Sequence, residues 1–116
     1  MELTPALVQA LVARLFKPEV RAEAADVLAQ YGTRAHEREE IRVRVAALKL
    51  SEGSLDRLRD LMAQAKRDYR DVLAWAEYPE ELRSPTWPLP VAEQARIRTA
   101  DREQYLAWLA AHGDGE

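Results

Sequence analysis

Cysteine is absent from this chain of 116 residues, which excludes disulfide bridges and thiolate metal sites. Glycine occurs only four times and phenylalanine once. No apolar run approaches the roughly 18 residues that a membrane-spanning helix needs. The N-terminus does not follow the pattern of a signal peptide, because Glu2 stands where a positive charge belongs and Arg14 interrupts the apolar face. We therefore expect a cytoplasmic protein that does not interact with a membrane.

Catalytic and cofactor motifs are also missing. The chain has no glycine-rich phosphate loop, no G-x-S-x-G elbow and no Cys/His pair. His36, Glu37 and Glu40 are spaced within one helical turn, but the second histidine of the H-E-x-x-H zinc motif is lacking. A solvated first helical turn is the better interpretation, so we predict no metal and no cofactor. An enzyme stays a further alternative, which would need a pocket with a strongly shifted pKa at His36 or a carboxylate.

Net charge is only −3, but it is unevenly distributed along the chain. Residues 34–70 carry ten basic and seven acidic side chains, whereas residues 71–116 carry four basic and nine acidic ones. This balance does not favour general binding to nucleic acid, although a local basic face is compatible with it. With 47% apolar and 32% charged residues, the composition is that of one globular domain spanning residues 1–116.

The stretch 39–50, E-E-I-R-V-R-V-A-A-L-K-L, is the expected centre of the fold. On a helix, one edge carries Ile41, Val45 and Leu48. The opposite edge carries Val43, Ala47 and Leu50. A helix with two apolar edges must be covered from two sides. We therefore predict a compact all-α single-domain bundle of five to seven helices, with residues 37–50 at its centre.

Local signals place the other helices. Thr4 precedes Pro5 and predicts a capped start for the first helix, and residues 18–31 predict the second helix. Thr33 is the expected cap of the third helix, and Ser54 is the expected cap of the fourth. Asp68 is expected to start a new helix, in which Asp71 completes a partial capping box. The proline-containing stretch from 79 to 90 is the least regular, and residues 91–112 are helical, either as one helix or as two divided at Thr99.

Two resemblances accompany this pattern. Pro18-Glu19-Val20-Arg21, Ala24-Ala25 and Val27-Leu28 make residues 18–32 similar to a helix of the HEAT type, which implies a HEAT-like N-terminus. The stretch 31–80 contains Y-G-T, A-A-L-K-L-S-E-G-S-L and D-Y-R-D-V-L-A-W-A-E-Y-P-E. It resembles short, all-helical bacterial proteins of uncharacterised function, which implies a bacterial origin and no particular activity.

Aromatic side chains concentrate in the last 48 residues, around the proline segment. Trp and Tyr provide large contact areas at low entropic cost, so an aromatic groove for a partner is one hypothesis. Its candidate residues are Trp75, Tyr78 and Trp87. The alternative is that the proline segment folds back and these rings form a core.

Arg38, Arg42 and Lys49 share one face of the expected central helix and are the candidates for binding an anion. The alternative is that they pair with carboxylates on neighbouring helices. From these patterns we expect a non-enzymatic helical protein that acts through protein–protein interaction, with self-association as the simplest version. The alternative is binding of nucleic acid or an anionic ligand through the basic helix face.

Overall fold

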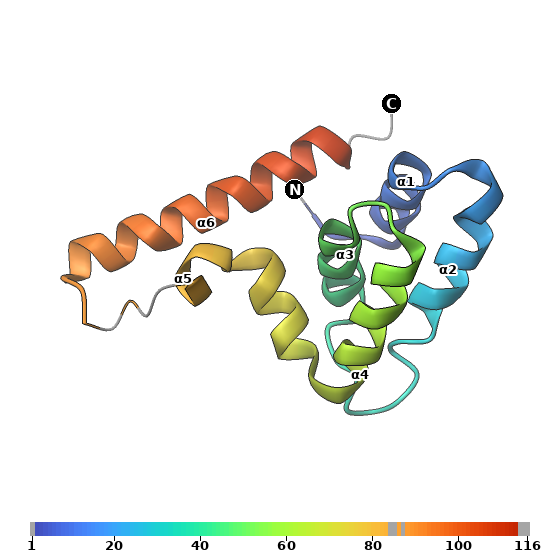
Figure 1. The fold of residues 1–116 in the computed structure, drawn as a ribbon, viewed down its shortest axis with the longest axis horizontal. Coiled ribbons are helices and arrows are strands. Elements are labelled where there is room, and N and C mark those ends of the chain that lie inside the picture. The colour runs from blue at the N-terminus through green and yellow to red at the C-terminus, as the bar shows by residue number, and fades with distance from the viewer. Residues whose placement is uncertain (1, 84–85, 87, 114–116) are drawn as a thin grey trace.

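The computed structural model describes residues 2–83, 86 and 88–113 of the chain. Within these ranges it contains six α-helices, one 3-10 helix and no β-strand, which confirms the predicted all-α fold of five to seven helices. The elements are α1 (Pro5–Leu15), η1 (Pro18–Val20), α2 (Arg21–Ala29), α3 (Glu40–Ser51), α4 (Leu55–Glu77), α5 (Pro79–Arg83) and α6 (Val91–His112) (Figure 1). The HEAT-like character of residues 18–32 stays a prediction.

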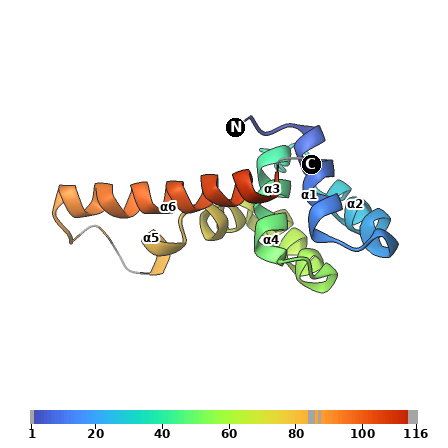
Figure 2. The same cartoon turned by 90° about the horizontal axis from the view of Figure 1, so that it is seen from above.

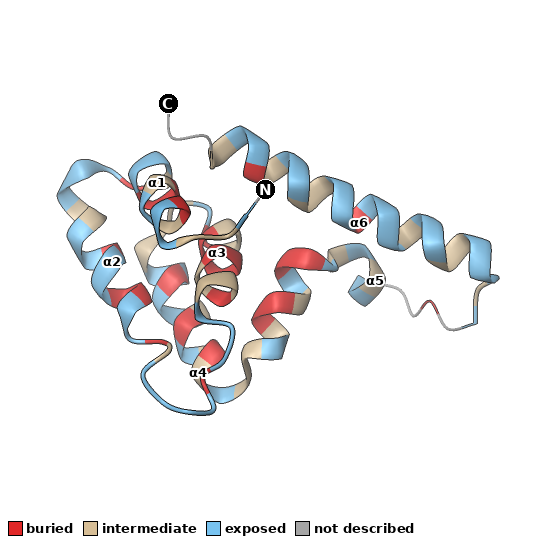
Figure 3. Ribbon diagram, turned by 180° about the vertical axis from the view of Figure 1, so that it is seen from behind, coloured by how far each residue is buried: buried red, intermediate tan, exposed pale blue. Residues whose placement is uncertain are grey.

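Helix α3 is the centre of the fold, as predicted. It packs against α1 and, most extensively, against α4. Val45 and Leu48 from one expected apolar edge are buried, and so are Val43 and Ala47 from the other. Figure 3 shows buried residues along α3. Complete burial of a Val or Leu side chain contributes about 1.5–3 kcal/mol. The covering of α3 on both sides therefore stabilises the bundle.

Most helix ends follow the local sequence signals. The Thr4 hydroxyl accepts a hydrogen bond from the Leu7 amide at 3.1 Å, and the Ser54 hydroxyl accepts one from the Arg57 amide at 3.3 Å. Beyond α3, Gly53 has a φ of +80°, and a Cβ there would lie 2.7 Å from the Leu15 carbonyl oxygen, so a side chain would not fit. Helix α6 runs through Thr99 without a break, which decides between the two predicted arrangements.

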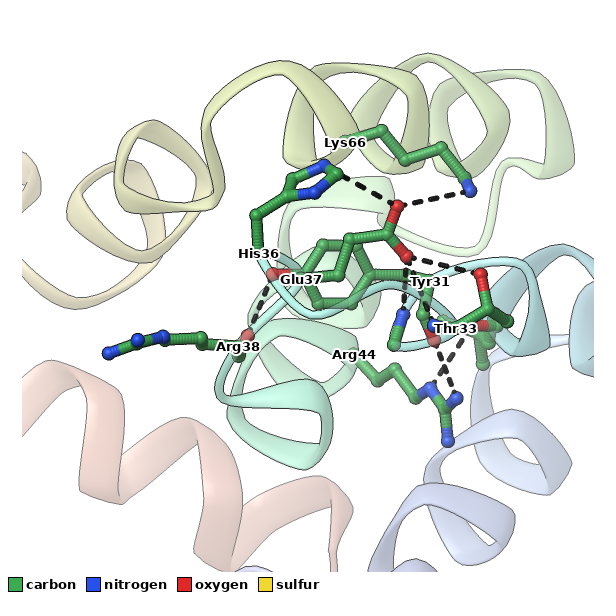
Figure 4. Close-up of polar contacts among 9 residues, drawn as sticks. Tyr31, Thr33, His36, Glu37, Arg38, Arg44 and Lys66 are labelled. Atoms are coloured by element: carbon green, nitrogen blue, oxygen red, sulfur yellow. Dashed lines mark hydrogen bonds and ion pairs between the residues drawn. The ribbon is translucent and has the colours of Figure 1, made fainter.

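The third helix starts later than predicted. Residues 30–39 form a loop, and α3 begins at Glu40 instead of next to Thr33. The reason is the buried carboxylate of Glu37, whose Oε1 accepts hydrogen bonds from the backbone amides of Gly32, at 2.9 Å, and Thr33, at 3.1 Å (Figure 4). A continuous helix would place Glu37 on an exposed first turn and remove these contacts. The solvated helical turn expected at His36–Glu40 is therefore wrong.

Contacts on both sides fix this loop to the bundle. The Tyr31 hydroxyl donates a 2.7 Å hydrogen bond to the Arg38 carbonyl oxygen. Arg44 of α3 donates to two carbonyl oxygens at the end of α2, that of Leu28 in its last turn, at 3.0 Å, and that of Tyr31 just beyond it, at 2.7 Å (Figure 4). A cation at this position also suits the negative end of the α2 dipole.

Helix α4 bends at Asp68, which has non-helical backbone angles of φ −156° and ψ 101°. The Asp68 carboxylate accepts a hydrogen bond from the Arg70 amide at 3.1 Å, so the predicted new helical start at Asp68 is confirmed. The capping box predicted with Asp71 is wrong, because the Asp71 carboxylate instead accepts a hydrogen bond from Gln64 at 2.9 Å. The bend divides the molecule into an N-terminal body, residues 2–68, and a C-terminal arm, residues 69–113.

The C-terminal arm consists of the second part of α4, then α5 and α6. Helix α5 lies within the stretch predicted to be least regular, and a side chain of α6 caps its first residues. The fully buried Asp101 of α6 accepts hydrogen bonds from the amides of Glu80, at 2.9 Å, and Glu81, at 3.1 Å. Figures 1 and 2 show α6 running from beyond α5 back to the body, near α1 and α3. Most of its length is exposed (Figure 3).

Candidate functional site

A cavity of about 440 Å³ opens where α6 faces α3 and the end of α4. We call this cavity the α6 groove. It is lined by residues from four parts of the chain: Leu3, Arg42, Glu77, Tyr78, Arg98, Arg102, Tyr105, Leu106 and Leu109. The groove brings together Arg42 and Tyr78, which were predicted for two different kinds of site.

An ion pair across the body–arm boundary forms the floor of the groove. Arg42 Nε lies 2.8 Å from Glu77 Oε2, and Arg42 Nη2 lies 2.5 Å from Glu77 Oε1. The side chain of Glu77 is only 10% exposed and that of Arg42 is 37% exposed. The hydrogen bonds with Glu77 raise the pKa of Arg42 above its usual value. A bidentate pair of this geometry holds both side chains in place, so the charge of Arg42 is offset by that of Glu77.

Tyr105 lines the groove from α6. Its hydroxyl oxygen is buried and has no hydrogen-bond partner among the residues described. Burial, followed by the negative charge of Glu77, raises the pKa of Tyr105 to about 12. The tyrosine therefore stays neutral, and its ring supports the groove wall without offering its hydroxyl to a ligand.

Large apolar side chains are exposed where α4 ends and α5 follows, and one of them, Tyr78, lines the groove. Trp75, Tyr78 and Leu82 are 43%, 41% and 53% exposed, and we call these three residues the apolar strip. They lie on successive turns, since the Leu82 amide donates a hydrogen bond to the Tyr78 carbonyl oxygen at 3.1 Å. Leu106, which is 41% exposed, lines the groove from α6. Trp75 and Tyr78 thus lie at the surface, and the alternative that they form a core is wrong for these two rings.

Arginines of α6 give the groove a positive rim. Arg98 Nε lies 3.4 Å from Glu81 Oε1, so its charge is partly offset. Arg102 forms no ion pair with any residue in the described part of the chain. With Arg42 neutralised by Glu77, the groove retains an excess of positive charge beside its apolar walls.

The remaining predicted residues lie elsewhere. Arg38 is in the loop before α3, so it does not share a helical face with Arg42 and Lys49 as expected. Lys49 is half-buried on α3, where burial lowers the pKa of its ammonium group despite the opposing charge of Asp101. Trp87 lies outside the described residues. The structure does not test anion binding by Arg38, Arg42 and Lys49, which stays a prediction.

Sequence reasoning missed the α6 side of the groove. Arg98, Arg102 and Leu106 are spaced four residues apart and therefore share one face of a helix. That spacing is a signal that could have singled them out. What the sequence could not show is that this face meets Tyr78 and the Arg42–Glu77 pair.

Within the described ranges, no group of three or more His, Asp or Glu side chains is arranged to hold a metal ion. None of the helices described is both long and apolar enough to cross a lipid bilayer. No family model, curated protein or solved structure matches this chain.

Proposed function

We propose that this chain binds another protein, and that the α6 groove receives an apolar segment of that partner carrying a carboxylate. The observation that carries the proposal is the placement of exposed Tyr78 and Leu106 in one groove with Arg102, a cation without an ion-pair partner among the described residues. Exposed Trp and Tyr side chains are the residue types that most often dominate binding energy in protein interfaces.

The apolar part of the site supplies the driving force. Tyr78 and Leu106 line the groove from different elements, and Trp75 and Leu82, three and four residues from Tyr78 in the sequence, are also exposed. Removing apolar surface from water contributes about 25 cal/mol per Å². An inserted Leu, Met or aromatic side chain would cover both Tyr78 and Leu106.

The polar part of the site selects the partner. A guanidinium group presents a planar set of donors that matches a carboxylate. Arg102 is free to make such a contact, and Arg98 is only loosely held at 3.4 Å from Glu81. A partner with a Lys or Arg at the same place would instead meet like charges. We therefore expect the recognised segment to be acidic as well as apolar.

A peptide-display selection tests this specificity across many sequences at once. We expect the selected peptides to share an Asp or Glu beside Leu, Met or aromatic residues. Binding of a selected peptide should weaken at least about tenfold on Tyr78→Ala or Arg102→Glu, the usual effect of removing a central interface residue. Arg57→Glu, at the opposite end of α4, changes net charge equally and should leave the affinity within about twofold.

Charge reversal sharpens the same experiment. The Arg102→Glu variant should regain affinity for a peptide whose carboxylate is replaced by Lys. Selected peptides without a shared carboxylate, or equal weakening by Arg102→Glu and Arg57→Glu, would overturn the proposal. A dimer that forms with rising concentration in light scattering and is lost on Tyr78→Ala would make a second copy the occupant and would overturn the choice of a foreign segment.

A further inference from the structure

A second cavity, of about 370 Å³, lies on another side of the body, where the loop 30–39 meets the bend of α4. Arg38 and His36 line it from the loop, and Lys66, Arg67 and Arg70 line it from α4. It has no residue in common with the α6 groove. This cavity, which we call the bend cavity, is therefore independent of the proposed partner site.

Positive charge exceeds negative charge in the bend cavity. Lys66 Nζ is offset by Glu37 Oε2 at 3.4 Å, and Arg70 Nε is offset by Asp68 Oδ1 at 2.9 Å. Arg38 and Arg67 form no ion pair with any residue in the described ranges. The four Lys and Arg side chains thus outnumber the two carboxylates by two, even with His36 uncharged.

The backbone that presents these cations is held in place. Arg38 is anchored by the hydrogen bond from the Tyr31 hydroxyl to its carbonyl oxygen, and Glu37 anchors the loop through Gly32 and Thr33. Figure 4 shows the Arg38 side chain pointing away from the Glu37 carboxylate, so Glu37 does not neutralise it. On the α4 side of the cavity, Asp68 fixes the bend of the helix, with Arg67 just before the bend and Arg70 just after it.

From this arrangement we infer that the bend cavity is a binding site for the phosphate group of a small molecule. A phosphate monoester carries about two negative charges at neutral pH, which equals the excess positive charge of the cavity. Its oxygens accept several hydrogen bonds at once, and arginine is the side chain best suited to donate them. Arg38 and Arg67 are the groups that contact the phosphate. Lys66 and Arg70 contribute mainly through the electrostatic attraction of their charges.

An NMR titration in phosphate-free buffer of low ionic strength tests the site. The probes are inorganic phosphate, glucose 6-phosphate and glucose. We expect saturable shifts of the amide signals of residues 36–38 and 66–70 with both phosphates. The double variant Arg38→Gln/Arg67→Gln should weaken the binding at least about tenfold and reduce its dependence on salt. The double variant Arg57→Gln/Arg59→Gln removes two exposed arginines from the start of α4 and should change the affinity less than about twofold.

The two phosphate probes separate the possible sources of the anion. Tighter binding of glucose 6-phosphate than of inorganic phosphate supports a phosphorylated metabolite as the ligand. Equal binding of the two supports a site that recognises the phosphate group alone. Shifts of the same residues with glucose would overturn the inference. Shifts that do not saturate, or equal weakening by both double variants, would also overturn it. Unchanged signals elsewhere in the Arg38→Gln/Arg67→Gln variant show that it is folded.

Discussion

Helices α3 and α6 show how differently the two parts of this molecule are built. Six of the 12 residues of α3 are buried, whereas only two of the 22 residues of α6 are buried, Asp101 and Leu109. The N-terminal body is therefore held by apolar packing around α3. The arm presents most of α6 to solvent, and both apolar and charged side chains of that helix remain free for binding.

Apolar and polar contacts both join the arm to the body. Val72, Leu73, Ala76 and Leu109 are buried in the same core as the apolar residues of the body. The Arg42–Glu77 pair connects the arm to α3, and the Gln104 side chain donates a 3.2 Å hydrogen bond to the Ala76 carbonyl oxygen. Asp101 holds the start of α5. Segments with little apolar burial open at lower free energy than the core. In α6 only Asp101 and Leu109 are buried, so we expect this helix to exchange its amide protons faster than α3, and the following changes test that difference.

The largest effect is expected from Leu48→Ala in the centre of the body. Leu48 is completely buried, and truncation of such a leucine costs about 2–5 kcal/mol of unfolding free energy. Leu106→Ala removes the same atoms from a 41% exposed side chain of the arm and should cost less than about 0.5 kcal/mol. Urea unfolding followed by circular dichroism measures both. Similar losses for the two variants would contradict the comparison.

A smaller loss is expected from Glu77→Gln, which removes the charge that pairs with Arg42. Breaking a fully buried pair costs about 3–5 kcal/mol, but Arg42 is 37% exposed and water screens it, so we expect about 1–2 kcal/mol. Hydrogen exchange should accelerate in α6 and in α4 after Asp68, with little change in α3. Equal acceleration in α3 would show that the arm and the body unfold as one unit.

The loop 30–39 makes the body sensitive to acid through Glu37. Burial opposes ionisation of this carboxyl, but hydrogen bonds from Gly32 and Thr33 and the nearby Lys66 hold its pKa at about 2, below the usual 4.5. The stability that ionised Glu37 contributes to the folded state is fully present above pH 4.5 and is lost as the pH falls through 2. The reason is that the carboxyl binds a proton more readily in the unfolded state than in the folded state. We expect the free energy of unfolding of the Glu37→Gln variant, measured between these pH values, to depend less steeply on pH than that of the wild type.

The smallest effect is expected from Tyr105→Phe, and its direction is unusual. The Tyr105 hydroxyl is buried without a hydrogen-bond partner among the described residues. Removing an unsatisfied buried polar group avoids its desolvation cost, so the variant should be as stable as the wild type or more stable, by up to about 1 kcal/mol. Thermal unfolding checks the sign. A clear loss of stability would mean that the hydroxyl has a partner in solution.

The sequence predicted most of the fold because helix ends depend on neighbouring residues. Thr4, Ser54 and Asp68 each accept a hydrogen bond from an amide two or three residues further along, so the pattern was visible locally. The start of α3 was wrong because the Glu37 carboxylate reaches back to Gly32 and Thr33 and is balanced by Lys66, 29 residues away. Helix propensity contains no information about such a contact.

The binding sites were predictable only in part. Tyr78 and Arg42 were singled out for their chemistry, but their meeting depends on the Arg42–Glu77 pair, which spans 35 residues of sequence. Arg38 was predicted for anion binding with Arg42 and Lys49, whereas it shares the bend cavity with Arg67 and Arg70. Since side chains meet in a cavity only after helices pack, spacing along one helix could not identify their neighbours.

By itself, the sequence determined that this chain is all-helical and that the apolar stretch 39–50 lies at its centre, because apolar periodicity and end caps act within a few residues. Only the tertiary structure decided that Trp75 and Tyr78 are exposed and that Arg42 is neutralised. It also decided that two cavities contain arginines with no ion pair to any described residue. The physical reason is that burial and ion pairing depend on which helix faces lie opposite each other, and that arrangement is a property of the packed bundle.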